Sequence, residues 1–566
     1  MTRGGEGLEP SALKALREPV VEAEGGGFRH WVDALADWLE ERLRLRGKEE
    51  YVFNGGLSVS GLQHIGRLRG EVILPETLRR ILESRGLRVR QYLTLYTQDA
   101  WKGKREQVAQ FGGGGEKYKG WPLARVPDPR GCHDSWVTHY WLDFGPYIAC
   151  FTDGRVEVVT TTYMYRGRLM EFTRMVYERR GEVRETINKY RGRRPYPEGW
   201  IPWEPRCQRC GRIDSTETIA IDFSRGVARY RCRACGHEGE APLWDGKLNW
   251  RIEWVGVWWS LGVDFEPYGK DHAVPGGSRD SACDLAVNVL GVRPPEGVPY
   301  EWVALRDGGQ ADMTSSGFRG VTPREWLSVA GPEVLRFLYL KTPPMRKVVV
   351  SMRQIPLYYQ QYYRAERIYY GVEEARDEKE RVLLSRSYEL SYTRAGPPER
   401  MPAQPPYTHV AILVQILPRS LWVSEGLRRL ARSGHLPENP TPFDLCRVES
   451  MMPRAYNWVR RYAPPSMRVE VKRELPRREL EAVPEELRRL LGLLAERLEG
   501  VEWREEEIKR VLVEFTEGWS QERRRAFYRA FYVAFTGRPS GPRAAPLLAL
   551  LDKGMVVERL RQASSI

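Results

Sequence analysis

Apolar residues recur at helical spacing just after residue 30, where they share one face: Trp31, Leu35, Trp38 and Leu39. This spacing predicts an amphipathic helix that begins at His30. Tyr51-Val52-Phe53 is typical of a short buried strand, and residues 54–61, rich in Gly and Ser, lead into a helix toward Leu74. Apolar residues between 89 and 95 predict a second strand. Strand, loop, helix and strand in this order indicate a parallel nucleotide-binding sheet.

The pattern changes after about residue 400, where apolar stripes at helical spacing alternate with arginine. One stripe consists of five leucines: Leu487, Leu490, Leu491, Leu494 and Leu498. Pro484, followed by two glutamates, is typical of the start of this helix. A second stripe follows: Phe527, Ala530, Phe531 and Ala534. The sequence therefore predicts an α/β part to about residue 340 and a helical C-terminal third.

The 566 residues exceed what one hydrophobic core supports, so several domains are expected. The net charge of +14 favours a polyanionic partner, nucleic acid first. An Arg-rich surface of the kind found in proteins from hot environments explains the 29% charged content equally well. No apolar run approaches the length of a bilayer span, and the N-terminus lacks the order of a secretory signal. We therefore expect a cytoplasmic protein without membrane contact.

Two close cysteine pairs, Cys207-x2-Cys210 and Cys232-x2-Cys235, have 21 residues between them. Four thiolates at this spacing predict a structural zinc ribbon at about residues 200–245. Because four sulfurs fill a tetrahedral site, no open position remains for catalysis. The stretch from Thr218 to Tyr230 is expected to form the hairpin of this ribbon. His237 lies directly behind a ligating cysteine, and we leave it out of the ligand set.

Three further residues of metal-ligating type lie close together in the sequence: Cys132, His133 and His139. A second metal site is one alternative for them. Single cysteines and histidines are more often packing or hydrogen-bonding groups, and we interpret these three in that way.

His64-Ile65-Gly66-Arg67 stands where the first predicted strand and its loop turn into a helix. A helix N-terminus carries partial positive charge and free backbone amides, which suit phosphates. His64 can donate a hydrogen bond to a phosphate oxygen, and Gly66 leaves room for a purine ring against the backbone. On its own, such a His-x-Gly triplet is more often a surface histidine.

Six ordered segments place that triplet in a wider pattern: Gly56 to Gly66, Pro127 to His133, Trp250 to Trp254, Gly269 to Ser278, Ala455 to Trp458, and Leu550 to Lys553. With them, the chain resembles class I lysyl-tRNA synthetases from about His30 to Arg561. The first motif of that family is of the type Thr-Pro-Ser-Gly-x-x-His-x-Gly-Asn. Here Ser58 replaces the Thr and keeps its hydroxyl, whereas Arg67 stands where the family has Asn.

The resemblance implies the residues of three overlapping sites. The implied catalytic residues are His64, Gly66, Arg67, Met313, Ser315 and Ser316. The implied ATP-binding residues are Ser60, His64, Gly66, Gly269, Asp271 and Met313. The implied lysine-binding residues are Gly56, Ser58, Trp250, His272 and Glu301. Trp250 is of the right type to cover the methylenes of lysine, and Glu301 to accept its ammonium group.

The fold implied is α/β: a Rossmann-type parallel-sheet catalytic domain with a zinc-ribbon insertion, followed by an all-α anticodon-binding domain. We expect a flexible extension at 1–27, the catalytic domain at 28–340, a connecting region that contacts the tRNA stem at 341–400, and the anticodon-binding domain at 401–566.

The activity implied is ATP-dependent ligation of lysine to tRNA(Lys). The lysine carboxylate attacks the α-phosphorus of ATP, which gives lysyl-adenylate and pyrophosphate, and the terminal hydroxyl of the tRNA then takes the lysyl group. The expected cofactors are ATP, Mg2+ and a structural Zn2+. The expected partners are tRNA(Lys) and L-lysine, and we expect a monomer.

One loop departs from the family pattern. Family members carry Lys-Met-Ser-x-Ser-Lys-Gly, whereas the matching stretch from Asp312 to Phe318 contains no lysine. Asp312 also puts a negative charge near the place where negative charge must be stabilised. Losing one donor that stabilises growing phosphate charge typically costs about 100- to 1000-fold in rate. Arg306 or Arg319 is a candidate replacement. The rival function is a synthetase paralogue with impaired adenylation that acts as a tRNA-binding or regulatory protein. A glutamyl-type synthetase is a third alternative, disfavoured by residues 250–272.

Overall fold

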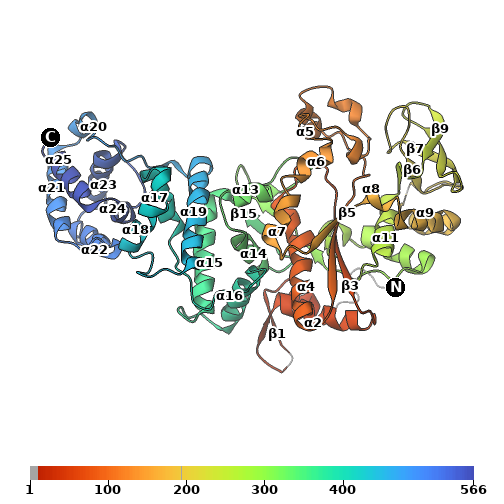
Figure 1. Cartoon of the computed structure of the whole chain (residues 1–566), viewed down its shortest axis with the longest axis horizontal. Helices are drawn as coiled ribbons and strands as arrows, with labels where there is room; N and C mark the ends of the chain where they lie inside the picture. The colour runs from red at the N-terminus through yellow and green to blue at the C-terminus, as the bar shows by residue number, and fades with distance from the viewer. Residues whose placement is uncertain (1–9, 24, 193) are drawn as a thin grey trace. The chain divides into compact units, whose positions relative to one another are not determined.

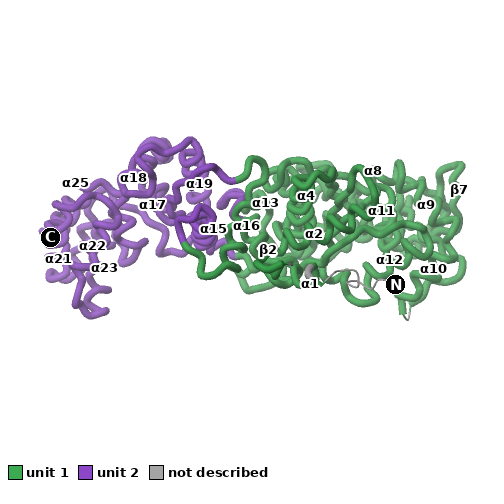
Figure 2. Tube along the Cα trace, turned by 90° about the horizontal axis from the view of Figure 1, so that it is seen from below, with its two compact units in different colours: residues 1–326, 335–350, 374–396 green, residues 327–334, 351–373, 397–566 purple. Residues whose placement is uncertain are grey.

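A computed structural model describes residues 10–23, 25–192 and 194–566. The chain divides into two compact units (Figure 2): unit 1 comprises residues 1–326, 335–350 and 374–396, and unit 2 comprises residues 327–334, 351–373 and 397–566. The expected flexible extension, residues 1–27, lies partly outside the described residues. Its described part holds helix α1 (Pro10–Ala15) and strand β1 (Val20–Glu22), which pairs with β2 (Phe28–His30).

Three parallel strands form the centre of unit 1, in the order β3 (Tyr51–Leu57), β4 (Val89–Leu95) and β5 (Val156–Thr160). β3 and β4 pair in register over their full length. Phe53 forms a further parallel bridge to Phe265, which in turn bridges Glu296, so the parallel pairing continues past β3. The parallel sheet predicted from the sequence is confirmed, and the loops that follow β3 and β4 leave the same edge of it.

Helices bury their apolar faces in two hydrophobic cores of unit 1. α2 (Trp31–Arg44) and α4 (Leu74–Ser84) share one core with β3, and they lie together beside it in Figure 1. α9 (Arg168–Glu178) and α11 (Trp250–Leu261) contribute to the other. The predicted helix after residue 30 is confirmed; His30 is its N-cap, and its ring nitrogen accepts the N–H of Val32.

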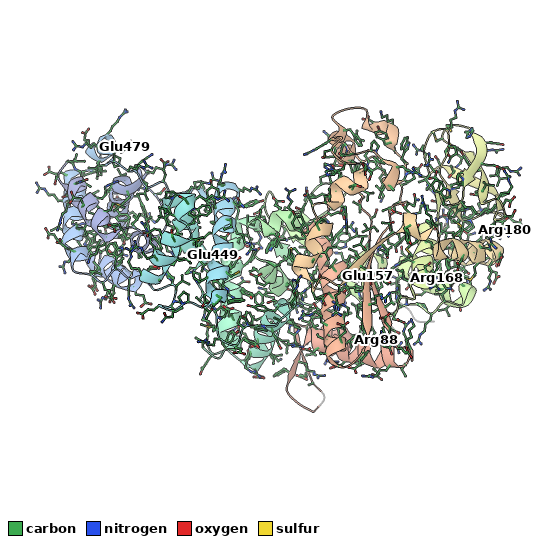
Figure 3. All side chains as sticks on the ribbon, in the orientation of Figure 1. Arg88, Glu157, Arg168, Arg180, Glu449 and Glu479 are labelled. Atoms are coloured by element: carbon green, nitrogen blue, oxygen red, sulfur yellow. The ribbon has the colours of Figure 1, made fainter. Side chains whose placement is uncertain are left out.

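A small antiparallel sheet follows the first cysteine pair and continues past the second. It consists of β7 (Thr216–Asp222), β8 (Val227–Cys232) and β9 (Glu238–Pro242), and β6 (Trp203–Pro205) pairs with β10 (Gly246–Leu248) beside it. The predicted hairpin is confirmed as β7 and β8. Arg168 on α9 and Arg180 on α10 (Arg180–Asn188) are exposed side chains of the helices that precede this sheet in the chain (Figure 3).

Short strands carry the segments that follow α11. β11 (Tyr268–Gly269) pairs in parallel with β12 (Pro299–Tyr300). β13 (Val303–Leu305) pairs in parallel with β15 (Val348–Val350) and antiparallel with β14 (Ala311–Asp312). The loop without lysine therefore begins in β14.

The described part of unit 2 is built from helices, as the apolar stripes predicted: α15 (Ile355–Tyr369), α17 (Tyr407–Ile416), α18 (Ser424–Arg432), α19 (Pro442–Arg461), α20 (Arg477–Glu481), α21 (Glu485–Glu499), α22 (Glu505–Phe515), α23 (Gln521–Thr536), α24 (Ala544–Leu550) and α25 (Lys553–Ser564). α21 begins directly after Pro484, where the sequence placed its start. Among the described residues, none of the helices combines the length and the apolar character needed to cross a membrane.

Candidate functional site

The first nucleotide loop runs from Ser60 to helix α3 (Ile65–Arg67), beyond the end of β3. Close packing explains its glycines. A Cβ atom on Gly61 would lie 2.5 Å from the carbonyl oxygen of Ser315, and one on Gly66 would lie 2.9 Å from Nδ1 of His64. The carbonyl of Ser60 accepts a hydrogen bond from Gln107 at 2.8 Å. The loop therefore packs against residue 315, which lies far along the chain.

The second loop, residues 312–319, is a tight hairpin. Thr314 and Arg319 exchange two backbone hydrogen bonds, of 2.8 and 3.1 Å. Met313 is buried, and its N–H donates to the carbonyl of Val303 at 3.0 Å. Phe318 closes the turn with a positive φ of 52°. The methionine thus anchors the hairpin, at whose tip Ser315 is buried and Ser316 is half-buried.

Side chains join the two loops. Nε of Arg67 donates to Oγ of Ser315 at 3.0 Å. Nζ of Lys104, from the segment after β4, donates to Oγ of Ser316 at 2.9 Å. The structure therefore brings together Arg67 and both serines of the predicted catalytic set. Sequence analysis missed Lys104, because it precedes Ser316 by 212 residues and belongs to no motif.

Asp312, whose charge looked unfavourable in the sequence, is paired. Nζ of Lys347, directly before β15, lies 2.8 Å from its carboxylate. Both side chains remain partly exposed, so solvent screens the pair and it adds little stability. The pair therefore matters for charge rather than for stability: the ammonium group of Lys347 lies beside the negative charge of Asp312 at the base of the hairpin.

His64 is buried at the start of α3. Burial, together with the positive charge of Arg67, lowers the pKa of its imidazole to about 3. The ring is therefore neutral at neutral pH. Among the described residues, its Nδ1 has no hydrogen-bond partner. The neutral imidazole of His64 can therefore form one more hydrogen bond, through Nδ1, to a ligand.

The other two predicted ATP contacts lie on a different element. Gly269 ends β11, and Asp271 is in the short turn that follows, Lys270–His272. Gly269 is buried and Asp271 is exposed. A Cβ atom on Gly269 would lie 2.6 Å from Oδ1 of Asp271, so only glycine leaves this aspartate in place.

Aromatic side chains of α11 and the turn after β11 form a cluster. The ring of His272 lies 5.3 Å from that of Trp250 and 5.4 Å from that of Trp254. The two indoles stack at 5.3 Å with 17° between their planes. The structure thus brings together two of the predicted lysine-binding residues, Trp250 and His272, and adds Trp254. Flat apolar faces of this kind suit the methylene chain of an amino acid.

Two buried carboxylates flank Gly56, and sequence analysis missed both. Oε2 of Glu71 accepts the N–H of Gly56 at 2.8 Å, and Oε1 accepts the hydroxyl of Tyr300. A Cβ atom on Gly56 would lie 3.4 Å from Oε1 of Glu266 and 3.0 Å from the ring of Tyr96. Within the described part of the chain, neither carboxylate forms an ion pair, and the hydroxyl of Tyr96 has no partner.

Burial raises the pKa of Glu71 to about 7, against the hydrogen bonds from Tyr300 and Gly56, and the charge of Glu266 adds to the rise. Burial also raises the pKa of Glu266. Glu266 accepts the indole N–H groups of Trp254 and Trp258, at 3.2 and 2.5 Å. The charges of Arg67 and Arg279 act against these rises, the first on Glu71 and the second on Glu266, but neither arginine lies within ion-pair distance of its carboxylate. A buried carboxylate that no cation contacts is costly, so this place beside Gly56 favours a positively charged ligand.

The remaining two residues of the predicted lysine site differ in their surroundings. Ser58 is half-buried just beyond β3. Glu301 already has a cation: Nζ of Lys270 lies 2.7 Å from its carboxylate. The same oxygen, Oε1, also accepts the backbone N–H of Trp302 at 2.9 Å. Glu71 and Glu266 accept one hydrogen bond on each oxygen, but among the described residues neither is paired with a cation, so they are the better acceptors for an ammonium group.

The four predicted zinc ligands converge. Sγ of Cys207 lies 3.7 Å from that of Cys235, and Sγ of Cys210 lies 3.7 Å from that of Cys232. Zinc–sulfur bonds of about 2.3 Å give a tetrahedron with edges of about 3.8 Å, so these sulfurs have the spacing that a zinc ion requires. All four donor atoms lie within 4.8 Å of one another.

A second cluster gathers the three residues interpreted above as packing groups, together with Asp128. Sγ of Cys132 lies 3.2 Å from Oδ2 of Asp128, 3.1 Å from Nδ1 of His133 and 3.5 Å from Nδ1 of His139. Both imidazole nitrogens lie 3.1 Å from the same carboxylate oxygen. Zinc bonds to nitrogen and oxygen of about 2.1 Å need donor spacings of about 3.4 Å, so these four residues form a second candidate metal centre. Sequence analysis did not include Asp128, which precedes Cys132 by four residues, among the possible ligands.

Comparison with known proteins agrees with this arrangement. A family model described as "tRNA synthetases class I (K)" matches residues 29–394, and one described as "Anticodon binding domain" matches residues 468–564. A lysine--tRNA ligase of Aeropyrum pernix is 60% identical over 543 residues, which are 95% of this chain and 98% of that protein. A lysine--tRNA ligase of Pyrococcus furiosus is 33% identical over 541 residues, 94% and 99% of the two chains.

The resemblance drawn from six short segments is thereby confirmed over most of the chain. The matched regions also agree with the parallel sheet of unit 1 and with the helices of unit 2. On these grounds, the chain belongs to the class I tRNA synthetase family, in the branch whose family model is that for lysine.

Proposed function

We propose that the chain ligates lysine to tRNA(Lys) with ATP, through lysyl-adenylate. The observation that supports this best is a combination of three features at β3, at the loop that follows it and at the hairpin of residues 312–319. A pair of hydroxyl-bearing loops meets two cations, and buried carboxylates stand beside Gly56. The curated relatives named lysine--tRNA ligases support the same substrate.

The nucleotide site is proposed to lie between the two loops. His64 donates a hydrogen bond to a phosphate oxygen as a neutral imidazole, since its pKa is far below neutral. Arg67 and Lys104 stand on either side of the serines of the hairpin and stabilise the charge that grows on the phosphates. Ser60, Gly66, Gly269, Asp271 and Met313 complete the proposed ATP contacts. Mg2+ arrives with the phosphates, which supply most of its ligands and whose charge it neutralises.

Lys104 is proposed to replace the missing lysine of the hairpin. Its ammonium group contacts Ser316 at the hairpin tip. Among the described residues, Arg306 and Arg319, the candidates named from the sequence, form no side-chain hydrogen bond to the serines of the hairpin, and Arg319 takes part in it through its backbone. Because Lys347 pairs with Asp312, the negative charge of that residue opposes the reaction less than the sequence suggested.

The lysine substrate is proposed to lie along Trp250 and His272, with its ammonium group held by the carboxylates beside Gly56. Glu266 and Glu71 take the role that the sequence gave to Glu301, which is paired with Lys270. An ammonium group between Glu71 and Glu266 would neutralise their buried charge. The hydroxyl of Tyr96, which has no hydrogen-bond partner among the described residues, is near enough to Gly56 to be a further acceptor. Close packing on Gly56 leaves space for the substrate only while residue 56 has no side chain.

Binding of the tRNA is proposed to involve unit 2, where residues 468–564 match an anticodon-binding domain. The net charge of +14 favours association with a polyanion. A monomer in the cytoplasm completes the proposal, since charged tRNA is consumed there by translation.

Zinc is proposed to be structural in both clusters of unit 1. The four sulfurs fill every position of a tetrahedral site and hold the two knuckles of the ribbon together. At the second cluster, Asp128 and His139 tie the start and the end of one loop. The substitutions Cys210→Ser and His139→Gln are each expected to lower the zinc content by one ion per chain, measured by elemental analysis. An unchanged zinc content would remove that cluster from the proposal.

Lysine-dependent exchange of pyrophosphate into ATP tests the function. The purified chain is expected to catalyse the exchange with lysine and not with arginine or glutamate. The rival, a paralogue with impaired adenylation, predicts tRNA(Lys) binding without exchange, whether or not the tRNA is added. Absence of exchange from a zinc-loaded, folded protein would decide for the rival.

A further inference from the structure

Unit 2 contains a cluster of two histidines and one glutamate that takes no part in the sites of unit 1. His409 lies on α17, His435 follows α18, and Glu505 is the first residue of α22. One donor atom from each lies within 4.8 Å of the other two. In sequence, Glu505 is 96 residues from His409 and 70 from His435. The fold therefore assembles this cluster from three separate segments.

The donor atoms converge on one point. Nε2 of His435 lies 2.7 Å from Oε2 of Glu505, and Nε2 of His409 contacts the same oxygen. These donors are closer together than the spacing of about 3.4 Å between zinc ligands, so the side chains must separate when an ion enters. The two imidazole rings stand edge to face, with 4.3 Å between their centroids and 68° between their planes. His409 is buried, with 6% of its surface exposed. Two rings held in this way direct one nitrogen each toward the carboxylate.

The tautomer of His409 is free to suit a metal ion. Its Nδ1 is buried and, among the described residues, has no hydrogen-bond partner. If a donor faced Nδ1, the proton would be held on Nε2 and the lone pair there would be lost. With no such donor, Nδ1 can carry the proton, and the lone pair of Nε2 then points into the cluster. A metal ion needs that lone pair.

We propose that His409, His435 and Glu505 bind one Zn2+ ion, with water as the fourth ligand. Two imidazoles and one carboxylate are an established ligand type for zinc, and the carboxylate supplies a charge opposite to that of the ion. The side chains of His435 and Glu505 are each 19% exposed, so water reaches the ion. The role proposed is structural.

The ion joins the anticodon-binding domain to the helices before it. Glu505 lies inside the matched domain, residues 468–564, whereas both histidines precede it. The N-terminus of α22 is thereby held to α17 and to the segment after α18. The three ligands lie far apart in the chain and come together only when unit 2 is folded. An ion that binds the folded state and not the unfolded state stabilises the folded state, so zinc should raise the thermal stability of unit 2.

Full-length protein, loaded with zinc and freed of excess, tests the site. The variants are His435→Gln and Glu505→Gln, and Glu506→Gln is the matched control, because Glu506 is an exposed neighbour in the same helical turn. Both site variants are expected to hold one zinc ion fewer per chain than the control, whatever the clusters of unit 1 hold. They should also lose part of the rise in melting temperature that zinc produces. Equal zinc content in all three variants would overturn the proposal.

Anomalous diffraction at the zinc absorption edge tests the site in crystals of the unaltered protein. Its result does not depend on how well the variants fold. An anomalous peak is expected between the two Nε2 atoms and the carboxylate of Glu505. Peaks at the clusters of unit 1 without one here would mean that the two histidines only donate hydrogen bonds to Glu505.

Discussion

Substitution of Lys104 by alanine is expected to slow lysine activation about 100-fold. Lys104 supplies the ammonium group nearest the tip of the second loop, 2.9 Å from Oγ of Ser316. Its side chain is exposed, which places its effect at the lower end of the range of about 100- to 1000-fold known for such donors. A 100-fold loss corresponds to about 2.7 kcal/mol of transition-state stabilisation.

The local structure should survive this change. Lys104 caps helix α5 (Arg105–Val108) through its backbone, whose N–H donates to Oε1 of Gln107 at 2.8 Å, and alanine keeps that N–H. Lys104→Arg preserves the charge and should recover most of the rate. Lys102→Ala is the matched control, because Lys102 is an exposed lysine two residues away; its rate should stay close to that of the unaltered protein.

The assay is lysine-dependent exchange of pyrophosphate into ATP at saturating lysine. The loss is expected in kcat, with the KM for lysine nearly unchanged, because the proposed lysine site is formed by other residues. A rate for Lys104→Ala within about twofold of that for Lys102→Ala would refute the replacement of the loop lysine by Lys104. An equal loss in both variants would point to the general charge of the segment instead.

Three further predictions concern the loops and the lysine site. Asp312→Lys should fail to raise the exchange rate and should lower the melting temperature slightly. The reason is that the new ammonium group would face Lys347, whose Nζ lies 2.8 Å from the carboxylate of Asp312 in the unaltered protein. A tenfold faster exchange would contradict this prediction. Glu266→Gln should raise the KM for lysine about 10- to 100-fold, as expected for a lost hydrogen bond to a charged group, and leave the KM for ATP unchanged. A change in the KM for ATP alone would exclude Glu266 from the proposed lysine site. The KM for lysine should fall as the pH rises from 6 to 8, because the raised pKa of Glu71, about 7, leaves its carboxyl protonated and uncharged at the lower pH; the same pH profile in Glu71→Gln would exclude this group.

The periodic parts of the fold were predictable from the sequence, because their signals are local. Helical spacing after residue 30, the buried strand at residue 51 and the paired cysteines each lie within a short stretch, and each corresponds to an element of the structure. Short-range patterns of apolar residues depend only on which face of an element is buried.

The parts that were missed depend on contacts between distant segments. Glu266 meets Gly56 across 210 positions of the chain, and no spacing rule connects a glycine in one strand with a glutamate beyond another. Glu301 was a reasonable acceptor by residue type, but its partner, Lys270, is 31 positions away and becomes a neighbour only through the parallel pairing of β11 and β12. Asp128 was visible in the sequence, yet an aspartate near a Cys-His pair is too common to count as a ligand without geometry.

The position of Lys104 bears on the choice between an active synthetase and an impaired paralogue. A lysine within the hairpin would move with it, whereas Lys104 is held from the other side: its N–H is bonded to Gln107, whose side chain donates to the carbonyl of Ser60 in the first loop. The backbone of Lys104 is therefore fixed relative to the loop of His64, and its side chain reaches Ser316 of the hairpin. Charge that stabilises a transition state acts best when it is already in place. Because the structure places the ammonium group of Lys104 at the tip of the hairpin, the absence of lysine at residue 312 is weak evidence for lost activity.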